Sequence, residues 1–473
     1  MEQDSTVFWP EERFHKRLEF EGRLIAGDKT LEDLHIIVQY SLLDNAQIKA
    51  IVIGNNDTFA SLVEFMGLPV PTYSIRLTCK TNDLDEIISD EVYIEHVHGR
   101  SVSEGIRFIV GELIFYSLTV KRKFVQIDQP ERHLTFYLCG PRQLWPSYGV
   151  LSKSFMGEVK YEVENSSLDI APDLPYTVEV RPVFFFEHDT EGHNDITTRD
   201  VYALHLATTN PESELPDAEY VKRGISLADD LTLLVSFVAR NWITWFSYSI
   251  QTATGITTLI RATRECREMR IDTNYLPIPL HRVSAFLKTA VSMLRELKSS
   301  GVDLSMPIAY VVNGNQLKYI QERFSVFFMA LEILKDYYAT GKNLYCILSK
   351  DDFRTLRVKL IPFIEKQVAS KLDSSKICGK LGELNRESLR SLLDIMFKQY
   401  DVSWEDLYPA KSKFSLIDTR NNLFHTGKQF DLQFLSKEEL RLRSILERLI
   451  LKMLGWHEHP YAPHDAIRLW LIS

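Results

Sequence analysis

The chain has 473 residues, 45% of them hydrophobic and 25% charged, which is a globular composition at a length that favours two or three domains. Its formal net charge of −9 excludes a general attraction to nucleic acid, so any contact with a polyanion must come from a local basic patch. The five cysteines include no C-x-x-C pair, which favours reduced thiols and a cytoplasmic protein over a disulfide or zinc framework.

The first part of the chain is rich in β-forming residues. No basic segment followed by an apolar one opens it, so no signal peptide is expected. Short runs of β-branched and aromatic residues then recur between turn signals, among them "LHIIVQYSLL", "IRFIVGELIFYSLTV" and "YTVEVRPVFFFE". They predict a β-rich region over residues 1–210, with a sandwich or barrel-like sheet.

A mixed region is predicted over residues 216–312. The run "AEYVKRGISLADDLTLLVSFVAR" has helical spacing, "WITWFSYSIQTATGITTLI" has β character, and "RVSAFLKTAVSMLRELKSSG" is helical with Gly301 as its stop. The best candidate for a membrane span is Leu231–Ile250, but Arg240 and Asn241 interrupt it at the centre, where a charge is most costly. No membrane segment is therefore expected.

From Gln316 onward the pattern is almost entirely helical. The helix predicted in "QLKYIQERFSVFFMALEILKDYYATG" carries an apolar stripe of Phe324, Phe327, Phe328, Leu331 and Leu334. Two helices follow in "KDDFRTLRVKLIPFIEKQV" and "RESLRSLLDIMFKQY", and a last one in "SKEELRLRSILERLILKMLG" has Ser436 as its cap and Gly455 as its stop. The expected fold class is α+β, with an N-terminal domain over residues 1–312 and an all-α bundle over residues 313–473.

A polar motif precedes the last helix, in "LIDTRNNLFHTGK". Ser415 and Asp418 match the S-x-x-D capping box and Gly427 suits a C-terminal stop, so a short helix is predicted over Leu416–Thr426.

The spacing of the polar residues on this helix constrains how they can act together. Asn421 and His425 are four residues apart and share a face, whereas Arg420 lies five residues before His425, about 140° around the axis. Arg420 must therefore reach around the helix with its long side chain or act across a subunit interface.

These residue types suit metal-free phosphodiester cleavage in RNA. A histidine can take the 2′-hydroxyl proton or protonate the leaving oxygen near neutral pH, and a guanidinium can hold phosphate oxygens bidentately. Lys411, Lys413 and Lys428 make the neighbourhood basic and are candidate RNA contacts. The aromatic residues of "YDVSWEDLY" are candidates for base stacking, although core packing is the simpler interpretation.

The bare spacing R-x(4–6)-H is a weak signal. Arg181 with His188 and Arg199 with His205 also match it, both in β-rich segments where a structural role is the simpler interpretation. Only "RNNLFH" adds an asparagine after the arginine, marked helix ends and a place before the last helix of an α-bundle.

With this context, the C-terminal region resembles HEPN domains, helical bundles whose signature is R-N-x-x-x-H. "RNNLFH" supplies that motif, and "ERFSVFFMALEILKDYY" is similar to the first helix of such domains, with Glu332 as its acidic residue. Together with the β-rich front half and the stretch "LTLLVSFVARNWITW", the chain resembles the ApeA-like group of large prokaryotic HEPN proteins.

The resemblance implies a metal-independent endoribonuclease without a cofactor, acting on RNA as a homodimer or higher homo-oligomer in which two motifs face each other. It also implies a role in defence against phage, with the N-terminal domain sensing a phage-derived trigger or regulating the nuclease. Carried over by motif position, Arg420 would stabilise the phosphorane, Asn421 would orient the site, and His425 would be general base or acid. Glu332 is a weaker candidate that would hold Arg420 in place.

Other interpretations stay open at this level. The motif could be a polar helix end, or the domain could bind RNA or nucleotide, or only dimerise, without cutting. Two histidine clusters have possible ligand spacings, but a polar tail and a solvated strand face explain them more simply, so no metal is expected. Their members are His457, His459 and His464 in one cluster and His96 and His98 in the other.

Overall fold

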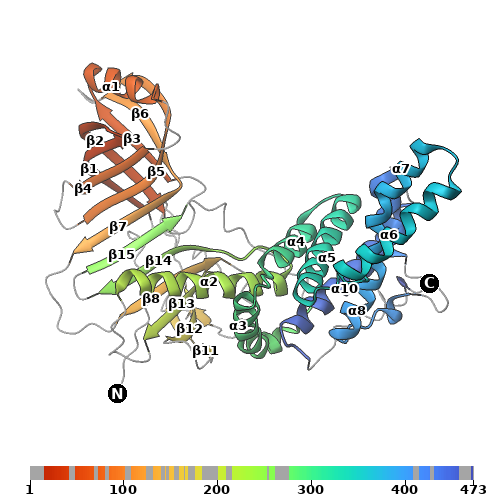
Figure 1. Cartoon of the computed structure of the whole chain (residues 1–473). Coiled ribbons are helices and arrows are strands. Elements are labelled where there is room, and N and C mark those ends of the chain that lie inside the picture. The colour runs from red at the N-terminus through yellow and green to blue at the C-terminus, as the bar shows by residue number, and fades with distance from the viewer. Residues whose placement is uncertain are drawn as a thin grey trace. The chain divides into compact units, whose positions relative to one another are not determined.

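The computed structural model describes most of the chain and has a β-rich N-terminal part and a helical C-terminal part (Figure 1), which confirms the α+β class. The described residues are 15–41, 48–68, 73–79, 85–101, 108–123, 132–139, 144, 149–153, 159–163, 166–168, 176–183, 201–208, 216–252, 255–261, 276–408, 415–426, 431–457 and 470–471.

Two compact units divide the chain. Unit 1 comprises Met1–Val235, Ile243–Thr273 and Pro279–Lys288, and unit 2 comprises Ser236–Trp242, Asn274–Ile278 and Thr289–Ser473. The boundary expected between residues 312 and 313 therefore falls inside unit 2. The physical reason is that α4 (Ser305–Gln316) packs against α5 (Ile320–Lys342) and α10 (Leu432–Met453) of the helical unit.

Unit 1 is built on one 13-stranded antiparallel sheet of order β11-β12-β13-β8-β14-β15-β7-β5-β4-β1-β2-β3-β6. A separate two-stranded sheet pairs β9 with β10. The strands are β1 (His15–Ala26), β2 (Lys29–Ser41), β3 (Ile48–Gly54), β4 (Tyr73–Cys79), β5 (Asp85–Ser101), β6 (Phe108–Phe115), β7 (Ser117–Lys123), β8 (His133–Cys139), β9 (Gly149–Lys153), β10 (Val159–Val163), β11 (Ser166–Leu168), β12 (Tyr176–Val183), β13 (Val201–Thr208), β14 (Trp245–Thr252) and β15 (Gly255–Arg261).

The long strand β5 closes part of this sheet into a ring. One edge of β5 pairs with β4, while the other edge pairs first with β7 and then, from Val92 to Ser101, with β6. Because β6 also pairs with β3, the strands β5, β4, β1, β2, β3 and β6 form a closed, barrel-like ring. Its apolar interior is continuous with Leu62 and Phe65 of α1 (Asn56–Met66), which lies at one end of the ring (Figure 1).

The second half of the sheet is covered by α2 (Asp217–Ala239). Tyr220 donates a hydrogen bond to the carbonyl of Leu206 on β13, and the indole of Trp245 on β14 donates to Asp229 at 2.7 Å. The predicted helix is thus confirmed, as is the β character of the stretch after it, which forms the paired strands β14 and β15. Within the described residues, no helix is both long and apolar enough to cross a membrane.

Unit 2 is a helical assembly around α10. The predicted stripe on α5 is confirmed, since all five of its apolar residues are buried. The helix α10 begins at Leu432 with Asp431 as its cap, so Ser436 was the wrong cap, whereas Gly301 and Gly455 have positive φ and end their helices as predicted. The other helices are α3 (Val283–Ser299), α6 (Lys350–Gln367), α7 (Lys371–Lys380), α8 (Leu389–Gln399) and α9 (Leu416–Asn421).

The crossing of α4 over α5 depends on Gly314. A Cβ at this position would overlap the ring of Phe327, which is fully buried on α5. Gly314→Ala is therefore expected to lower the free energy of unfolding by about 1–3 kcal/mol through overpacking, although alanine favours helix. Gly341→Ala is the matched control, because nothing lies near its Cβ position on α5; chemical denaturation should show no loss for it. Equal losses in both variants would contradict this packing role.

The central helix α10 also buries charge. Glu447 is fully buried and accepts two hydrogen bonds from Arg240, at 2.7 and 2.8 Å. Arg240 follows the last residue of α2 and has a φ of +52°, a left-handed conformation that is costly for arginine, so the ion pair helps to hold it there.

Glu439 on α10 gives stability a pH dependence. Burial raises the pKa of its carboxyl, an effect that nearby Glu447 adds to and that Arg443, Arg323 and Arg240 oppose. A carboxyl whose folded pKa is raised binds its proton more tightly in the folded state, so stability falls as pH rises above the ordinary glutamate range. Glu439→Gln is expected to be more stable than wild type at neutral pH and to show a shallower fall. Urea unfolding at a series of pH values tests this, and an unchanged slope would contradict it.

Candidate active site

The motif helix forms over the predicted span, Leu416–Thr426, but in two conformations. Residues Leu416–Asn421 are α-helical as α9, and Asn422–Thr426 form a π-helical turn that carries His425. A π-turn closes hydrogen bonds between residues five apart, so it brings such residues nearer to one side than an α-helix does. The angle around the helix axis between Arg420 and His425 is therefore smaller than the 140° expected for an ideal α-helix. The His425 side chain lies outside the described residues.

Arg420 is anchored by polar contacts from two helices. Its Nη2 donates to Oε1 of Glu332 on α5 at 3.0 Å, and its Nη1 donates to Oδ1 of Asn421 at 3.1 Å. The Arg420 side chain is 26% exposed and that of Glu332 is 34% exposed, so the ion pair lies at the surface and is partly shielded from water. Asn421 is exposed at the end of α9. Glu332 thus occupies the holding position expected for it.

Two aromatic rings complete the environment of Arg420. Its guanidinium carbon is 5.8 Å from the ring centroid of Phe328 on α5 and 5.7 Å from that of Phe424 in the π-turn, within cation–π range. Neither phenylalanine was predicted as a site residue. Helical spacing was the available signal, because Phe328 precedes Glu332 by four residues and Phe424 follows Arg420 by four.

The start of α9 is fixed by a buried partner instead of by its own cap. The predicted capping box is wrong: the Ser415 hydroxyl donates to Oε1 of Glu438 on α10 at 2.9 Å and makes no side-chain cap. Burial raises the pKa of Glu438, opposed by hydrogen bonds from Arg441 and Ser415. Arg441 also donates to the carbonyls of Leu407 and Leu471. The chain segments that contain Leu407, Ser415 and Leu471 therefore meet at α10.

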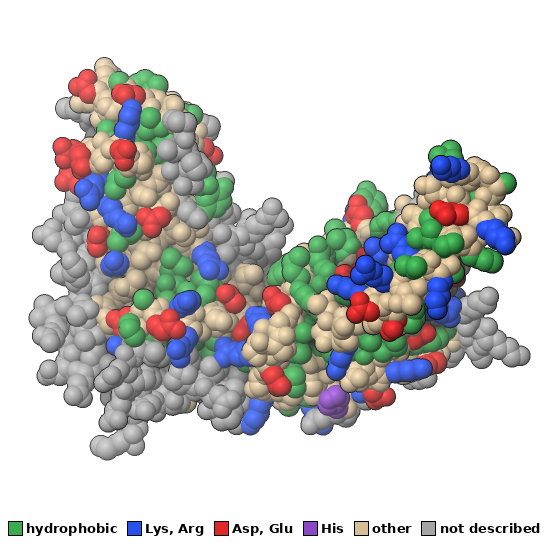
Figure 2. All heavy atoms as spheres, viewed as in Figure 1, with side chains coloured by type: hydrophobic (Ala, Val, Ile, Leu, Met, Phe, Trp, Pro, Cys, Tyr) green, Lys and Arg blue, Asp and Glu red, His purple; other side chains and the backbone are tan. Residues whose placement is uncertain are grey.

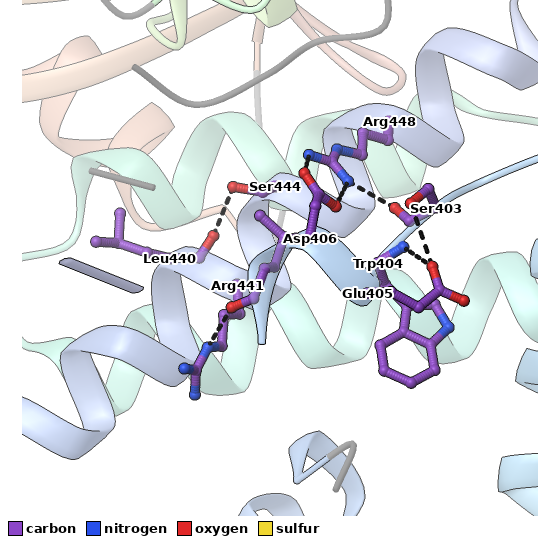
Figure 3. A network of polar contacts seen from close by, with 9 residues as sticks. Ser403, Trp404, Glu405, Asp406, Leu440, Arg441, Ser444 and Arg448 are labelled. Carbon is purple, nitrogen blue, oxygen red and sulfur yellow. Dashed lines mark hydrogen bonds and ion pairs between the residues drawn. The ribbon is translucent and has the colours of Figure 1, made fainter. Parts of the chain in front are cut away.

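The segment "YDVSWEDLY" is also tied to α10 (Figure 3). Arg448 donates to both carboxylate oxygens of Asp406, at 2.7 and 2.8 Å, and to the carbonyl of Ser403. Tyr408 is buried, with Arg441 over its ring at 4.4 Å. For Tyr408, core packing is therefore the correct interpretation, and base stacking is excluded by burial.

The remaining predicted residues are only partly described. Lys411, Lys413 and Lys428 lie outside the described residues, as do His459 and His464. His457 is exposed just after α10. His96 and His98 lie on β5, with side chains outside the described set, and no metal-binding group of three or more His, Cys, Asp or Glu side chains occurs within that set.

The arrangement around Arg420 is suited to binding an anion. A guanidinium presents its N–H donors in a planar fork that matches the oxygens of a phosphate, and that of Arg420 also contacts Glu332 and Asn421. Its charge is held at a fixed place by a carboxylate and two rings, next to the π-turn that carries a histidine. Comparison of the chain with protein-family models, with curated proteins and with solved structures finds no match.

Proposed function

We propose that the protein is a metal-independent endoribonuclease whose catalytic residues are Arg420, Asn421 and His425. The observation that carries the proposal is the placement of Arg420: Glu332 and Phe328 of α5 hold its guanidinium five residues before His425, where the α-helix gives way to a π-turn. Single π-turns are rare and occur frequently at functional sites.

Each side chain has a distinct role in the proposed reaction. The 2′-hydroxyl oxygen attacks the adjacent phosphorus and the bond to the 5′-oxygen of the next nucleotide breaks, leaving a 2′,3′-cyclic phosphate. His425 acts as general base or acid in the two proton transfers, for which an imidazole is suited near neutral pH. Arg420 binds the phosphate oxygens as negative charge builds up, and Asn421 orients the site. Glu332 is a positioning residue for Arg420.

The proposal extends to assembly and biological role. The motif acts at the interface of a homodimer or higher oligomer, in the cytoplasm of a prokaryotic cell during defence against phage. Unit 1 senses a phage-derived trigger or restrains the nuclease, because an unregulated ribonuclease would harm its own cell. A composite site is tested by mixing Arg420→Ala with His425→Ala protomers: a change in activity on mixing supports it, and unchanged activity contradicts it.

The mechanism is tested by removing the attacking group from the substrate. An RNA oligonucleotide and the same oligonucleotide with 2′-deoxyribose throughout are incubated with the purified chain in EDTA. Cleavage of the RNA alone, with cyclic phosphate ends, is the expected result. Cleavage of both oligonucleotides would contradict 2′-hydroxyl attack, and binding of RNA without cleavage would favour a non-catalytic binding module.

A further inference from the structure

The hairpin of α6 and α7 lacks a buried face. The two helices pack against each other (Figure 1), and the hairpin is described throughout residues 350–380. Ser374 is its one buried residue, and α6 has none. Helices in folded proteins are normally stabilised by burying an apolar face, so a helix of 18 residues without a buried side chain is unusual.

The hairpin is basic in an acidic protein. Residues 350–380 hold eight Lys and Arg against four Asp and Glu, while the rest of the chain holds 47 against 60. The hairpin therefore has a formal charge of +4 and the remainder −13. Figure 2 shows Lys and Arg side chains gathered over this part of the helical unit. Because the protein is acidic as a whole, a polyanion can bind only where positive charge is concentrated locally, and the hairpin is such a place.

These positive charges are not neutralised within the described residues. The one ion pair of the hairpin joins Lys376 to Asp373 at 3.9 Å, a pair internal to α7. On α6, Lys350, Arg354 and Arg357 are exposed and recur at helical spacing, so they point to one side and form a row of cations. In high-dielectric surroundings such a row attracts phosphates at little desolvation cost.

The apolar side chains of α6 recur at helical spacing and are half-buried or exposed. Phe353, Leu360 and Ile364 are half-buried, and the exposed Leu356 and Phe363 lie on the same side of the helix, whereas Val358 lies on the opposite side from Leu356. The row of cations lies beside this stripe, and its charge favours a polyanion as the partner of the row. Phe363 is 61% exposed, but it follows Lys350, Arg354 and Arg357 by 13, nine and six residues, which places it 120° or more around the helix from that row.

The hairpin belongs to the same compact unit as the candidate active site. Glu332 lies ten residues, or about 15 Å, before the end of α5 at Lys342, and α6 begins at Lys350. We propose that the α6–α7 hairpin is the surface on which the protein holds its RNA substrate, with Lys350, Arg354 and Arg357 on the phosphates. This inference rests on RNA being the substrate.

The test measures RNA binding without cleavage. In full-length protein carrying Arg420→Ala, Lys350, Arg354 and Arg357 are replaced together by alanine, and the anisotropy of a short unstructured fluorescein-labelled RNA is followed at several salt concentrations. The affinity at low salt is expected to fall by at least about tenfold, and the slope of log affinity against log salt to shrink by about 2, for three lost phosphate contacts. Unchanged affinity and slope would overturn the inference.

A matched triple variant controls for total charge. Lys121, Lys222 and Lys398 are exposed and lie on β7, α2 and α8, so their replacement by alanine removes the same charge away from the hairpin. The control triple is expected to bind RNA as the parent does, and an equal loss in both triples would overturn the inference. Circular dichroism confirms that each variant is folded.

Two further measurements exclude other partners. The first is binding to anionic phospholipid vesicles, and the second is the oligomeric state. The inference fails if the hairpin triple keeps its RNA affinity but no longer binds the vesicles. It also fails if the triple keeps its RNA affinity but is a monomer where the parent is a dimer. Its failure is distinct from that of the proposed function. If the wild-type chain binds RNA through the hairpin but does not cut it, the proposed function fails and the inference stands. If the wild-type chain cuts RNA and the hairpin triple binds RNA as the parent does, the inference alone fails.

Discussion

Arg420→Ala is expected to lower the rate of RNA cleavage by about 10²–10³-fold, the usual cost of removing a group that stabilises transition-state charge. The structure supplies the reason for so large an effect, because Glu332, Phe328 and Phe424 hold the guanidinium in place before substrate binds. A preorganised charge is worth more than a mobile one, since no reorganisation is needed during the reaction. Single-turnover cleavage of a labelled RNA measures the rate.

Two variants separate catalysis from positioning at Arg420. Arg420→Lys keeps the charge but loses the planar fork, so most of the loss is expected to remain. Glu332→Gln leaves Arg420 charged but less firmly held, and is expected to lower the rate less than Arg420→Ala does. Recovery of the wild-type rate by Arg420→Lys would show that only the charge matters. A wild-type rate in Arg420→Ala would remove Arg420 from the reaction.

Glu447→Ala is expected to lower the free energy of unfolding of the helical unit by about 3–5 kcal/mol, because it removes the carboxylate that makes two hydrogen bonds to Arg240 in a largely buried position. The Glu447 side chain is fully buried and that of Arg240 is 13% exposed. Gln316 also donates to the carbonyl of Arg240 at 3.0 Å, so the loss of the ion pair disturbs the junction of α2, α4 and α10. Urea denaturation followed by helical circular dichroism measures the effect.

Two controls interpret that loss. The double variant Arg240→Met, Glu447→Leu removes both charges together and is expected to recover much of the stability, since an apolar pair can replace a buried ion pair. Arg223→Ala breaks an exposed pair with Glu219, at 3.0 Å on α2, and is expected to cost less than about 1 kcal/mol. A loss for Glu447→Ala no larger than that for Arg223→Ala would contradict the buried-pair interpretation.

Helices with strong periodicity were predictable from the sequence. The stripe on α5 and the stops at Gly301 and Gly455 follow from local spacing and from glycine's access to positive φ. The helix caps were less predictable, because several side chains compete for each helix start. Asp431 caps α10 in place of Ser436, and Ser415 donates to Glu438, which is 23 residues away in sequence. A tertiary partner of this kind leaves no local signal.

The closure of the sheet also depends on distant pairings. The strands of unit 1 were predicted from alternation and turn signals, but the ring closes only because β6 pairs with both β3 and β5. At the candidate site, the sequence predicted Arg420, Asn421, His425 and Glu332, and the structure brings Glu332 to Arg420. The sequence did not predict the π-turn, because local propensities favour an α-helix through residue 426.

Cleavage of RNA by the purified full-length chain in the presence of EDTA, with His425→Ala as the matched variant, tests the proposed function most directly. The wild-type chain is expected to cut the RNA and leave 2′,3′-cyclic phosphate ends, because no step of the proposed reaction requires a metal ion. His425→Ala is expected to be inactive, since it lacks the group that transfers the proton. Wild-type cleavage that EDTA abolishes, or cleavage that persists in His425→Ala, would contradict the proposal.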